Sequence, residues 1–494
     1  MQKKGNIFKF WFISLLILIS FDFKPSNSYI VFPLEYLPKT YYKFLPKGDY
    51  SDNPEIIMKE LYYKRLITYL NIGTPLKSQM MFIDTDSSRF FLTSLNPPHK
   101  QHKELKISDF YHFGEKLFFN ESESSTYKED ECKEHEQYYD EVCFGKDKIK
   151  FNFGNYSSTL VFPIKIYKGE DESIPGLIGL STNGTLYYGS KNLISELKLY
   201  NLIKDYYYFF DFEKFSPLNS EIKGNLIIGD LPHNIFPDKY SKEDFINLKY
   251  HSDSSFWSYK MKKIVIESNT TKDIQIENIK IHTFYEFYHV IGTREFWNQI
   301  RELFLDKLEK ENKCFKGNFS QNLFSENDLN FYYCDKSVEK ILIDNLSGIK
   351  FYSRDSDYIF ELTKDELYYK KGKYIYFNVL FLKQVFNDWI LGQIFTSKYH
   401  FVFHTDSRQI GFYKKINIPK TKNLDTDDNL EEEKVNKKIW TFIFITAFVF
   451  ITIGIIIGIV IGIKFLKRKR NKRAEELVDE DYDYTPKNEN NVVN

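Results

Sequence analysis

The sequence predicts a mainly β ectodomain followed by a single transmembrane helix. Aromatic residues make up 18 % of the 494 residues, including 37 Tyr and 47 Phe, a composition that favours strands over helix bundles. Short apolar runs separated by turn residues recur from residue 62 to about residue 415, as expected of β-structure. The hydrophobic fraction of 42 % is enough to bury the cores of roughly two to four lobes or domains.

The N-terminal 28 residues have the pattern of a secretory signal peptide. Lys3, Lys4 and Lys9 precede an apolar run at residues 10–20, and Ser26 and Ser28 provide small residues for cleavage before Tyr29. An uncleaved anchor helix is the alternative, but the run is shorter than the ~20 residues that a bilayer core requires. We therefore expect residues 1–28 to be removed.

Residues 439–463 carry no charged side chain and are long enough to span a bilayer. A buried core helix is the alternative, but this segment is Ile-rich on every face and lacks capping residues. The basic residues that follow, from Lys464 to Arg473, place the tail at residues 464–494 in the cytosol by the positive-inside rule. The sequence therefore predicts a type I protein of a secretory-pathway, vacuolar or plasma membrane, with a lumenal or extracellular ectodomain.

The net charge and the acidic stretches bear on partners. Lys plus Arg and Asp plus Glu both number 68, so no overall positive field exists to gather nucleic acid. Residues 417–438 are poor in apolar side chains and include an acidic run, which is typical of a solvated stalk before the membrane. Helical patterning is local, at residues 191–203 and 293–307. We expect no cofactor and no metal site.

Four cysteines and six N-glycosylation sequons all fall in the predicted ectodomain. Two disulfides suit an oxidising compartment, and three connectivities are open from the sequence. The cysteine spacing matches no zinc site. The cysteines are Cys132, Cys143, Cys314 and Cys334, and the sequons begin at Asn120, Asn155, Asn183, Asn269, Asn318 and Asn345.

The passage at residues 63–92 carries the most specific chemical signal. An alternating strand ends in the turn sequence Ile-Gly-Thr-Pro at residues 72–75, and a second apolar strand delivers Asp84 at its end, followed by Thr85, Asp86 and Ser87. This arrangement resembles the N-terminal lobe of the pepsin-like aspartic peptidases, in which a strand and IGTP are followed by DTGSS. Asp86 replaces the glycine of that motif.

Further segments extend the resemblance over residues 62–413, in the order that the family has them. Pro175, Gln393 and His404 stand where the family has acids. The resembling segments are Phe119 with residues 124–127, then residues 174–180, 224–229, 257–260, 389–395 and 410–412. The resemblance implies a bilobal pepsin-like fold, with an N-terminal lobe at residues 61–245 and a C-terminal lobe at residues 246–416. Residues 29–60 then form either a propeptide or an N-terminal extension.

The resemblance also implies two carboxylates that share a proton and activate a water. Asp84 is expected to supply the first, with Thr85 bracing its loop and Ser87 contacting the carboxylate. The second motif, Asp-Thr/Ser-Gly, does not occur downstream of residue 86. The best-aligned stretch, residues 279–284, places His282 in the position of the acid, and the other candidates for a second acid are Asp273 and Asp86.

Two further departures concern the same site. A side chain at Asp86 must find room where the family has glycine, and its charge would repel Asp84. The expected flap region contains Tyr139 but lacks the family's YGxG pattern.

The resemblance implies that Cys132 pairs with Cys143 and Cys314 with Cys334, within the two lobes.

Two functions of different classes follow. The first is an active aspartic endopeptidase that uses Asp84 with an unconventional second acid. The second is a catalytically weak or inactive relative that retains a cleft for extended peptides. The missing motif and the replaced acids favour the second. In both cases the expected partner is a peptide or protein in an extended conformation, and we expect a monomer.

Overall fold

A β-hairpin lies at the centre of the N-terminal lobe. Its strands, β3 (Leu66–Ile72) and β4 (Lys77–Asp84), are antiparallel and bury their aliphatic residues and Phe82. Gly73, in the turn between them, has a φ of 89°, a conformation that favours glycine. The hairpin belongs to an eight-stranded sheet in the order β2-β3-β4-β9-β5-β8-β7-β6. The other strands are β2 (Glu35–Tyr36), β5 (Phe90–Thr93), β6 (Lys128–Glu134), β7 (Glu141–Phe153), β8 (Tyr156–Lys168) and β9 (Gly176–Gly179).

The description rests on a computed structural model, which covers most of the predicted ectodomain. Residues up to Ile418 form one unit, separate from the residues that follow. The structure describes residues 29–42, 52–94, 117–134, 141–154, 156–168, 174–181, 192–216, 221–248, 257–268, 274–320, 328–382, 388–416, 463–464 and 466–468.

The C-terminal lobe contains a mostly antiparallel sheet of eleven strands, which confirms a mainly β fold. Its order is β19-β18-β13-β14-β23-β15-β22-β17-β21-β20, with β16 paired to β17 at the side. The strands are β13 (Ser258–Glu267), β14 (Ile274–Thr283), β15 (Val290–Gly292), β16 (Cys314–Ser320), β17 (Asp328–Asp335), β18 (Gly348–Ser353), β19 (Ile359–Thr363), β20 (Tyr368–Lys371), β21 (Tyr374–Phe377), β22 (Val379–Leu382) and β23 (Trp389–Leu391).

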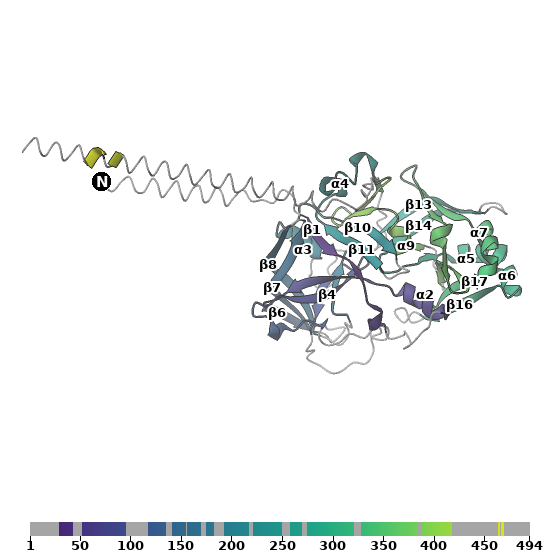
Figure 1. Cartoon of the computed structure of the whole chain (residues 1–494), viewed down its shortest axis with the longest axis horizontal. Helices are drawn as coiled ribbons and strands as arrows, with labels where there is room; N and C mark the ends of the chain where they lie inside the picture. Colours follow the sequence, from purple (N-terminus) through teal and green to yellow (C-terminus); the bar gives the residue numbers. More distant parts are fainter. Residues whose placement is uncertain are drawn as a thin grey trace, which may run out of the picture. The chain divides into compact units, whose positions relative to one another are not determined.

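A third sheet of six strands takes strands from both halves of the chain, in the order β1-β11-β10-β24-β25-β12. Figure 1 shows β1, β10 and β11 between β6, β7 and β8 on one side and α5, α6 and β17 on the other. The strands are β1 (Ile30–Pro33), β10 (Tyr207–Ser216), β11 (Glu221–Ile228), β12 (Phe245–Leu248), β24 (Phe401–His404) and β25 (Gln409–Tyr413). The two lobes are therefore joined by hydrogen-bonded backbone.

The residues before the N-terminal lobe form part of the folded body. Strand β1 pairs with β11, and β2 pairs with β3. Helix α2 (Pro54–Tyr62) follows, with Asn53 capping its first turn through Glu55 N and Ile56 N. Strands β1 and β2 thus contribute to two of the sheets.

Short helices lie at the sheet edges. The predicted helices at residues 191–203 and 293–307 correspond to α3 (Leu193–Leu199) and to the continuous run of α5 (Arg294–Ile300), η6 (Arg301–Leu305) and α6 (Asp306–Lys310). Asn192 and Thr293 cap α3 and α5. The others are η1 (Lys39–Tyr41), η3 (Glu121–Glu123), α4 (Pro232–Ile235), η5 (Lys242–Asp244), η7 (Lys336–Val338), α7 (Glu339–Asn345), α8 (Lys364–Leu367) and α9 (Gln393–Thr396).

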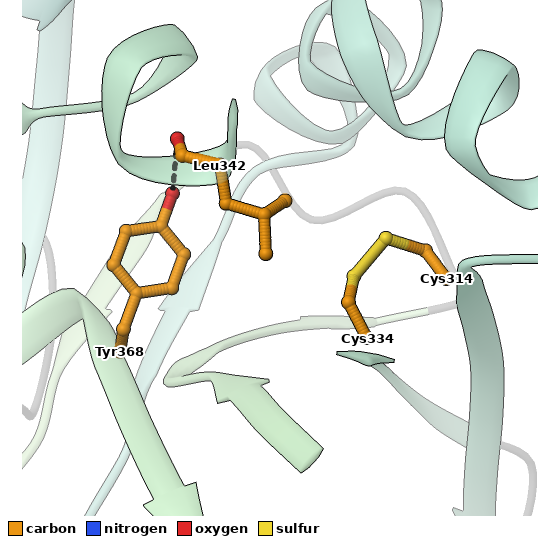
Figure 2. Close-up of a disulfide and its surroundings, with 4 residues drawn as sticks. All are labelled: Cys314, Cys334, Leu342 and Tyr368. Atoms are coloured by element: carbon orange, nitrogen blue, oxygen red, sulfur yellow. Dashed lines mark hydrogen bonds between the residues drawn. A yellow bond between two sulfur atoms is a disulfide. The ribbon is translucent and has the colours of Figure 1, made fainter. Parts of the chain in front are cut away.

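The disulfide Cys314–Cys334 joins directly opposed residues of β16 and β17, as the family resemblance implied. Figure 2 shows it near Leu342 of α7, whose carbonyl accepts a hydrogen bond from the Tyr368 hydroxyl at 3.0 Å. Cys143 is also disulfide-bonded, and Cys132 lies opposite it in the register of β6 and β7. The side chain of Cys132 lies outside the described residues.

No helix in the described part of the chain is long and apolar enough to cross a membrane. The predicted signal peptide, the stalk and residues 439–462 of the predicted span lie outside the described residues. The membrane anchor and the orientation of the tail therefore stay predictions.

Candidate functional site

Asp84 ends β4 at the centre of the N-terminal lobe. Strand β4 runs parallel to β9, with Asp84 opposite Gly179. The backbone N–H of Leu180, just after β9, donates to the Asp84 carbonyl at 2.8 Å, so the end of the strand is held from that side. A side chain on Gly179 would collide with the Ser87 and Arg89 backbone, which explains the glycine. Contacts with Gly179 and Leu180 thus hold Asp84 in place.

The loop after Asp84 folds back onto its carboxylate. The backbone N–H groups of Asp86 and Ser87 donate to Oδ1 of Asp84 at 2.8 and 3.0 Å. Ser87 therefore contacts Asp84 through its backbone, while its hydroxyl accepts a hydrogen bond from Arg89 N at 3.1 Å.

The C-terminal lobe repeats this arrangement of strands. Strand β14 runs parallel to β23 as β4 runs parallel to β9, and β15 is antiparallel to β23 as β5 is to β9. Thr283 lies opposite Leu391, which places Phe284 next to Gly392. Because Asp84 lies opposite Gly179 in the first lobe, Phe284 occupies the equivalent position in the second. An aromatic side chain thus stands where a second carboxylate is required.

Loop length supports the same correspondence. Five residues separate Asp84 from β5, and five residues separate Phe284 from β15. Glu286 is therefore the counterpart of Asp86, and each of these five-residue loops carries an acid at its second position. Glu286 was not among the sequence candidates, because its loop, Phe-Tyr-Glu, retains no residue of the expected motif.

The carboxyl group of Glu286 crosses between the lobes to Thr85. The Thr85 hydroxyl lies 2.8 Å from Oε1 and 3.0 Å from Oε2 of Glu286, and the Thr85 backbone N–H also donates to Oε1. In return, Tyr285 N donates to the Thr85 hydroxyl at 3.3 Å. Arg65 donates to the Glu286 carbonyl at 2.7 Å. Thr85 thus links the loop after Asp84 to the corresponding loop of the other lobe.

Burial and neighbouring charge raise the pKa of both additional acids. Burial, and then the charge of Asp84, raise the pKa of Glu286 to about 8. The same two causes raise the pKa of Asp86 to about 7. Oδ1 of Asp86 is buried and forms no hydrogen bond with the described residues. Both acids are therefore mostly neutral at mildly acid pH.

The second loop is closed to solvent. Phe284 and Glu286 are each 7 % exposed, and Tyr285 and His289 are fully buried. Tyr62 of α2 stacks on Phe287 with ring centroids 5.1 Å apart. The end of helix α2 thus packs against the loop in which a second catalytic acid was expected.

The structure corrects the position proposed for His282. His282 precedes Phe284 by two residues and lies opposite Ile390, so it does not occupy the place of the second acid. Its Nε2 lies 2.9 Å from Oδ2 of Asp388, and burial lowers its pKa, which disfavours an imidazolium donor. The prediction for His282 was wrong by two residues, because the strand register cannot be read from residues 279–284 alone.

The remaining expected site residues have separate outcomes. Asp273 and Tyr139 lie outside the described residues. Gln393 is fully buried, accepts from the Tyr36 hydroxyl at 3.2 Å and donates to the carbonyls of Lys64 and Tyr285 at 3.2 and 2.7 Å. His404 contacts Asp205 at 3.2 Å, far along the chain from the Asp84 loop. Among the described residues, no group of His, Cys, Asp and Glu could hold a metal ion.

Comparison with known proteins agrees with this geometry. A sequence model of the family described as eukaryotic aspartyl protease matches residues 65–415, which includes both lobes. No match to the chain was found among curated proteins.

Proposed function

The chain belongs to the eukaryotic aspartyl protease family, and from this premise we propose that its ectodomain binds extended peptides but hydrolyses them weakly or not at all. A bilobal β fold of this family provides two lobes between which an extended chain can be held by backbone hydrogen bonds. The observation that carries the proposal is the strand register, which gives Phe284 the position equivalent to Asp84.

One carboxylate completes only half of the mechanism. Asp84 can accept a proton from water, but the reaction also needs an acid for the amide oxygen or the leaving nitrogen. Glu286 is poorly placed to act as that acid, because its carboxyl group is buried and hydrogen-bonded to Thr85. We expect peptide hydrolysis to be at least ~10³-fold slower than with a complete pair, the scale of losing a positioned acid or base.

The test is a comparison of the purified protein with its Asp84→Asn variant. Peptide binding should be measurable for both, and hydrolysis at acid pH should be low and little changed by the substitution. A control variant, Asp388→Asn, removes an acid that contacts His282 instead of the Asp84 loop. Turnover at an ordinary enzymatic rate that Asp84→Asn abolishes would contradict the proposal.

A second candidate function is an active endopeptidase with an unconventional acid. The observation in its favour is that Glu286 and Asp86 lie beside Asp84 and hold their protons up to about pH 8 and pH 7. In that case Glu286→Gln or Asp86→Asn should abolish hydrolysis as fully as Asp84→Asn. Equal, low hydrolysis in all three variants and the parent excludes this candidate.

We further propose that the domain is anchored as a type I membrane protein. Its support is the uncharged segment at residues 439–463, the basic residues that follow and the N-terminal signal pattern.

A further inference from the structure

A pocket of about 510 Å³ lies at the side of the C-terminal lobe, outside the Asp84 region. We call it the Trp297 pocket. Its walls come from α5, η6, α6 and the β16–β17 hairpin. The lining residues are Trp297, Arg301, Asp306, Glu309, Lys310, Lys316 and Tyr332. Its volume is in the range of sites that hold small ligands.

A π-helical turn and the disulfide-linked hairpin shape this pocket. The segment η6 interrupts the helix between α5 and α6, and such turns are often found at functional sites. Trp297 Nε1 donates to the Tyr332 hydroxyl at 3.1 Å, which joins the helix to β17. The disulfide in Figure 2 fixes the start of β16 against β17, so Lys316 is held at the rim.

The lining combines aromatic walls with charges of both signs. Lys316 Nζ lies 4.9 Å from the centroid of the Trp297 ring, and Arg301 Nε lies 3.3 Å from Oδ1 of Asp306. Within the described residues, Lys310 and Lys316 form no ion pair with a carboxylate. Such a lining suits a neutral ligand with many hydroxyl groups. Lysine and arginine side chains can donate hydrogen bonds to hydroxyl groups, and carboxylates can accept hydrogen bonds from them.

The sequon at Asn318 lies beside this pocket. Asn318 follows Lys316 by two residues in β16, so both side chains lie on one face of the strand, about 7 Å apart. Their cross-strand partners are Asn330 and Tyr332, and Tyr332 lines the pocket. Asn318 is exposed and its side chain forms no hydrogen bond with the described residues. A sugar joined to Asn318 would begin next to the rim.

We propose that an N-linked glycan on Asn318 folds back onto the Trp297 pocket and that its first N-acetylglucosamine units occupy it. This inference rests on the lumenal ectodomain of the proposed function, since N-glycans are added there. The glycan is tethered, so its effective concentration at the pocket is on the order of millimolar and weak contacts suffice. Its role is to cover the π-helical turn and the edge strand β16.

The test uses the full chain, made in a eukaryotic secretory host, with glycan occupancy measured by mass spectrometry. Ser320→Ala removes the sequon but keeps Asn318, and Ser347→Ala removes the sequon at Asn345 as a matched control. The first change should speed hydrogen exchange at residues 297–310 about fivefold, which corresponds to ~1 kcal/mol. The control should leave these amides unchanged.

A second pair of variants tests the pocket independently of the sequon. Lys316→Ala should speed exchange at residues 297–310 in the glycosylated chain but add little in the Ser320→Ala chain, whereas Lys313→Ala, outside the pocket, should have no effect. An unoccupied Asn318 beside other occupied sequons, or unchanged exchange in Ser320→Ala, overturns the pocket proposal alone. A chain with no occupied sequon overturns the lumenal topology and this proposal with it.

Discussion

The carboxyl group of Glu286 in the C-terminal lobe lies 2.8 Å from the hydroxyl of Thr85 in the N-terminal lobe and accepts a hydrogen bond from the Thr85 backbone. This contact joins the loop after Asp84 to the equivalent loop of the second lobe. It also places an acid with a raised pKa in the buried junction. The stability of the domain should therefore depend on pH.

Because the pKa values of both acids are higher in the folded state than their ordinary values, the free energy of unfolding should fall as pH rises. Glu286 rises from 4.5 to about 8 and Asp86 from 3.8 to about 7. The contribution of the two protonated acids to the free energy of unfolding is complete below about pH 4. It is lost as pH rises toward 8, by at most about 1.4 kcal/mol per pH unit for each group. Urea denaturation from pH 4.5 to pH 8 should show this decline.

Glu286→Gln should flatten the decline, because the amide keeps the neutral shape but cannot ionise. Any loss of stability in the variant should occur at acid pH, where Glu286 of the parent is neutral. Near pH 8 the variant should be more stable than the parent. Glu302→Gln, on an exposed position of η6, is the control and should leave the pH profile unchanged. A Glu286→Gln profile that is parallel to the parent from pH 4.5 to 8 would show that Glu286 does not titrate in this range.

Gln393→Glu should destabilise the domain by about 2–5 kcal/mol. The buried amide donates to the carbonyls of Lys64 and Tyr285, and a carboxylate cannot donate to either. Gln275→Glu, an exposed change of the same type in β14, should stay within about 0.5 kcal/mol of the parent. Equal urea midpoints for the two variants would argue against the network around Gln393.

Replacing both Cys314 and Cys334 by Ser should lower the free energy of unfolding by about 2–4 kcal/mol, because the disulfide closes a loop of 20 residues. Thermal denaturation under non-reducing conditions measures this loss. Peptide mapping of the parent should also find Cys132 linked to Cys143. A mixed pair, such as Cys132 with Cys334, would contradict both the register of β16 with β17 and the assignment to separate lobes.

The tail at residues 464–494 should be cleaved by protease added to sealed vesicles whose cytosolic face is outward, because basic residues after the span retain that end in the cytosol. The ectodomain should stay protected until detergent is added, which serves as the internal control. Protection of the tail together with the ectodomain would rule out the type I orientation.

Asp84 could be found from the sequence because its signal is local. Two strands, the IGTP turn and the residues after Asp84 are contiguous, and each element matches the structure. The two predicted helices were also found, since their apolar spacing and caps lie within one segment. The second loop could not be recognised, because Phe284, Tyr285 and Glu286 replace all three residues of the expected motif. The register of β14 with β23 identified it, and the loop length agrees.

By itself the sequence determined the mainly β fold, because strand periodicity depends on neighbouring residues, and its resemblance to the family pointed to Asp84 at the end of a strand. Only the tertiary structure decided that Phe284 occupies the position where the second acid was expected. It also decided that Glu286 hydrogen-bonds to Thr85 and that Gln393 hydrogen-bonds to distant backbone segments. The hydrogen bonds among them connect residues 108, 201 and 329 positions apart. Contacts of that kind follow from strand register and burial in the folded chain, which no local pattern encodes.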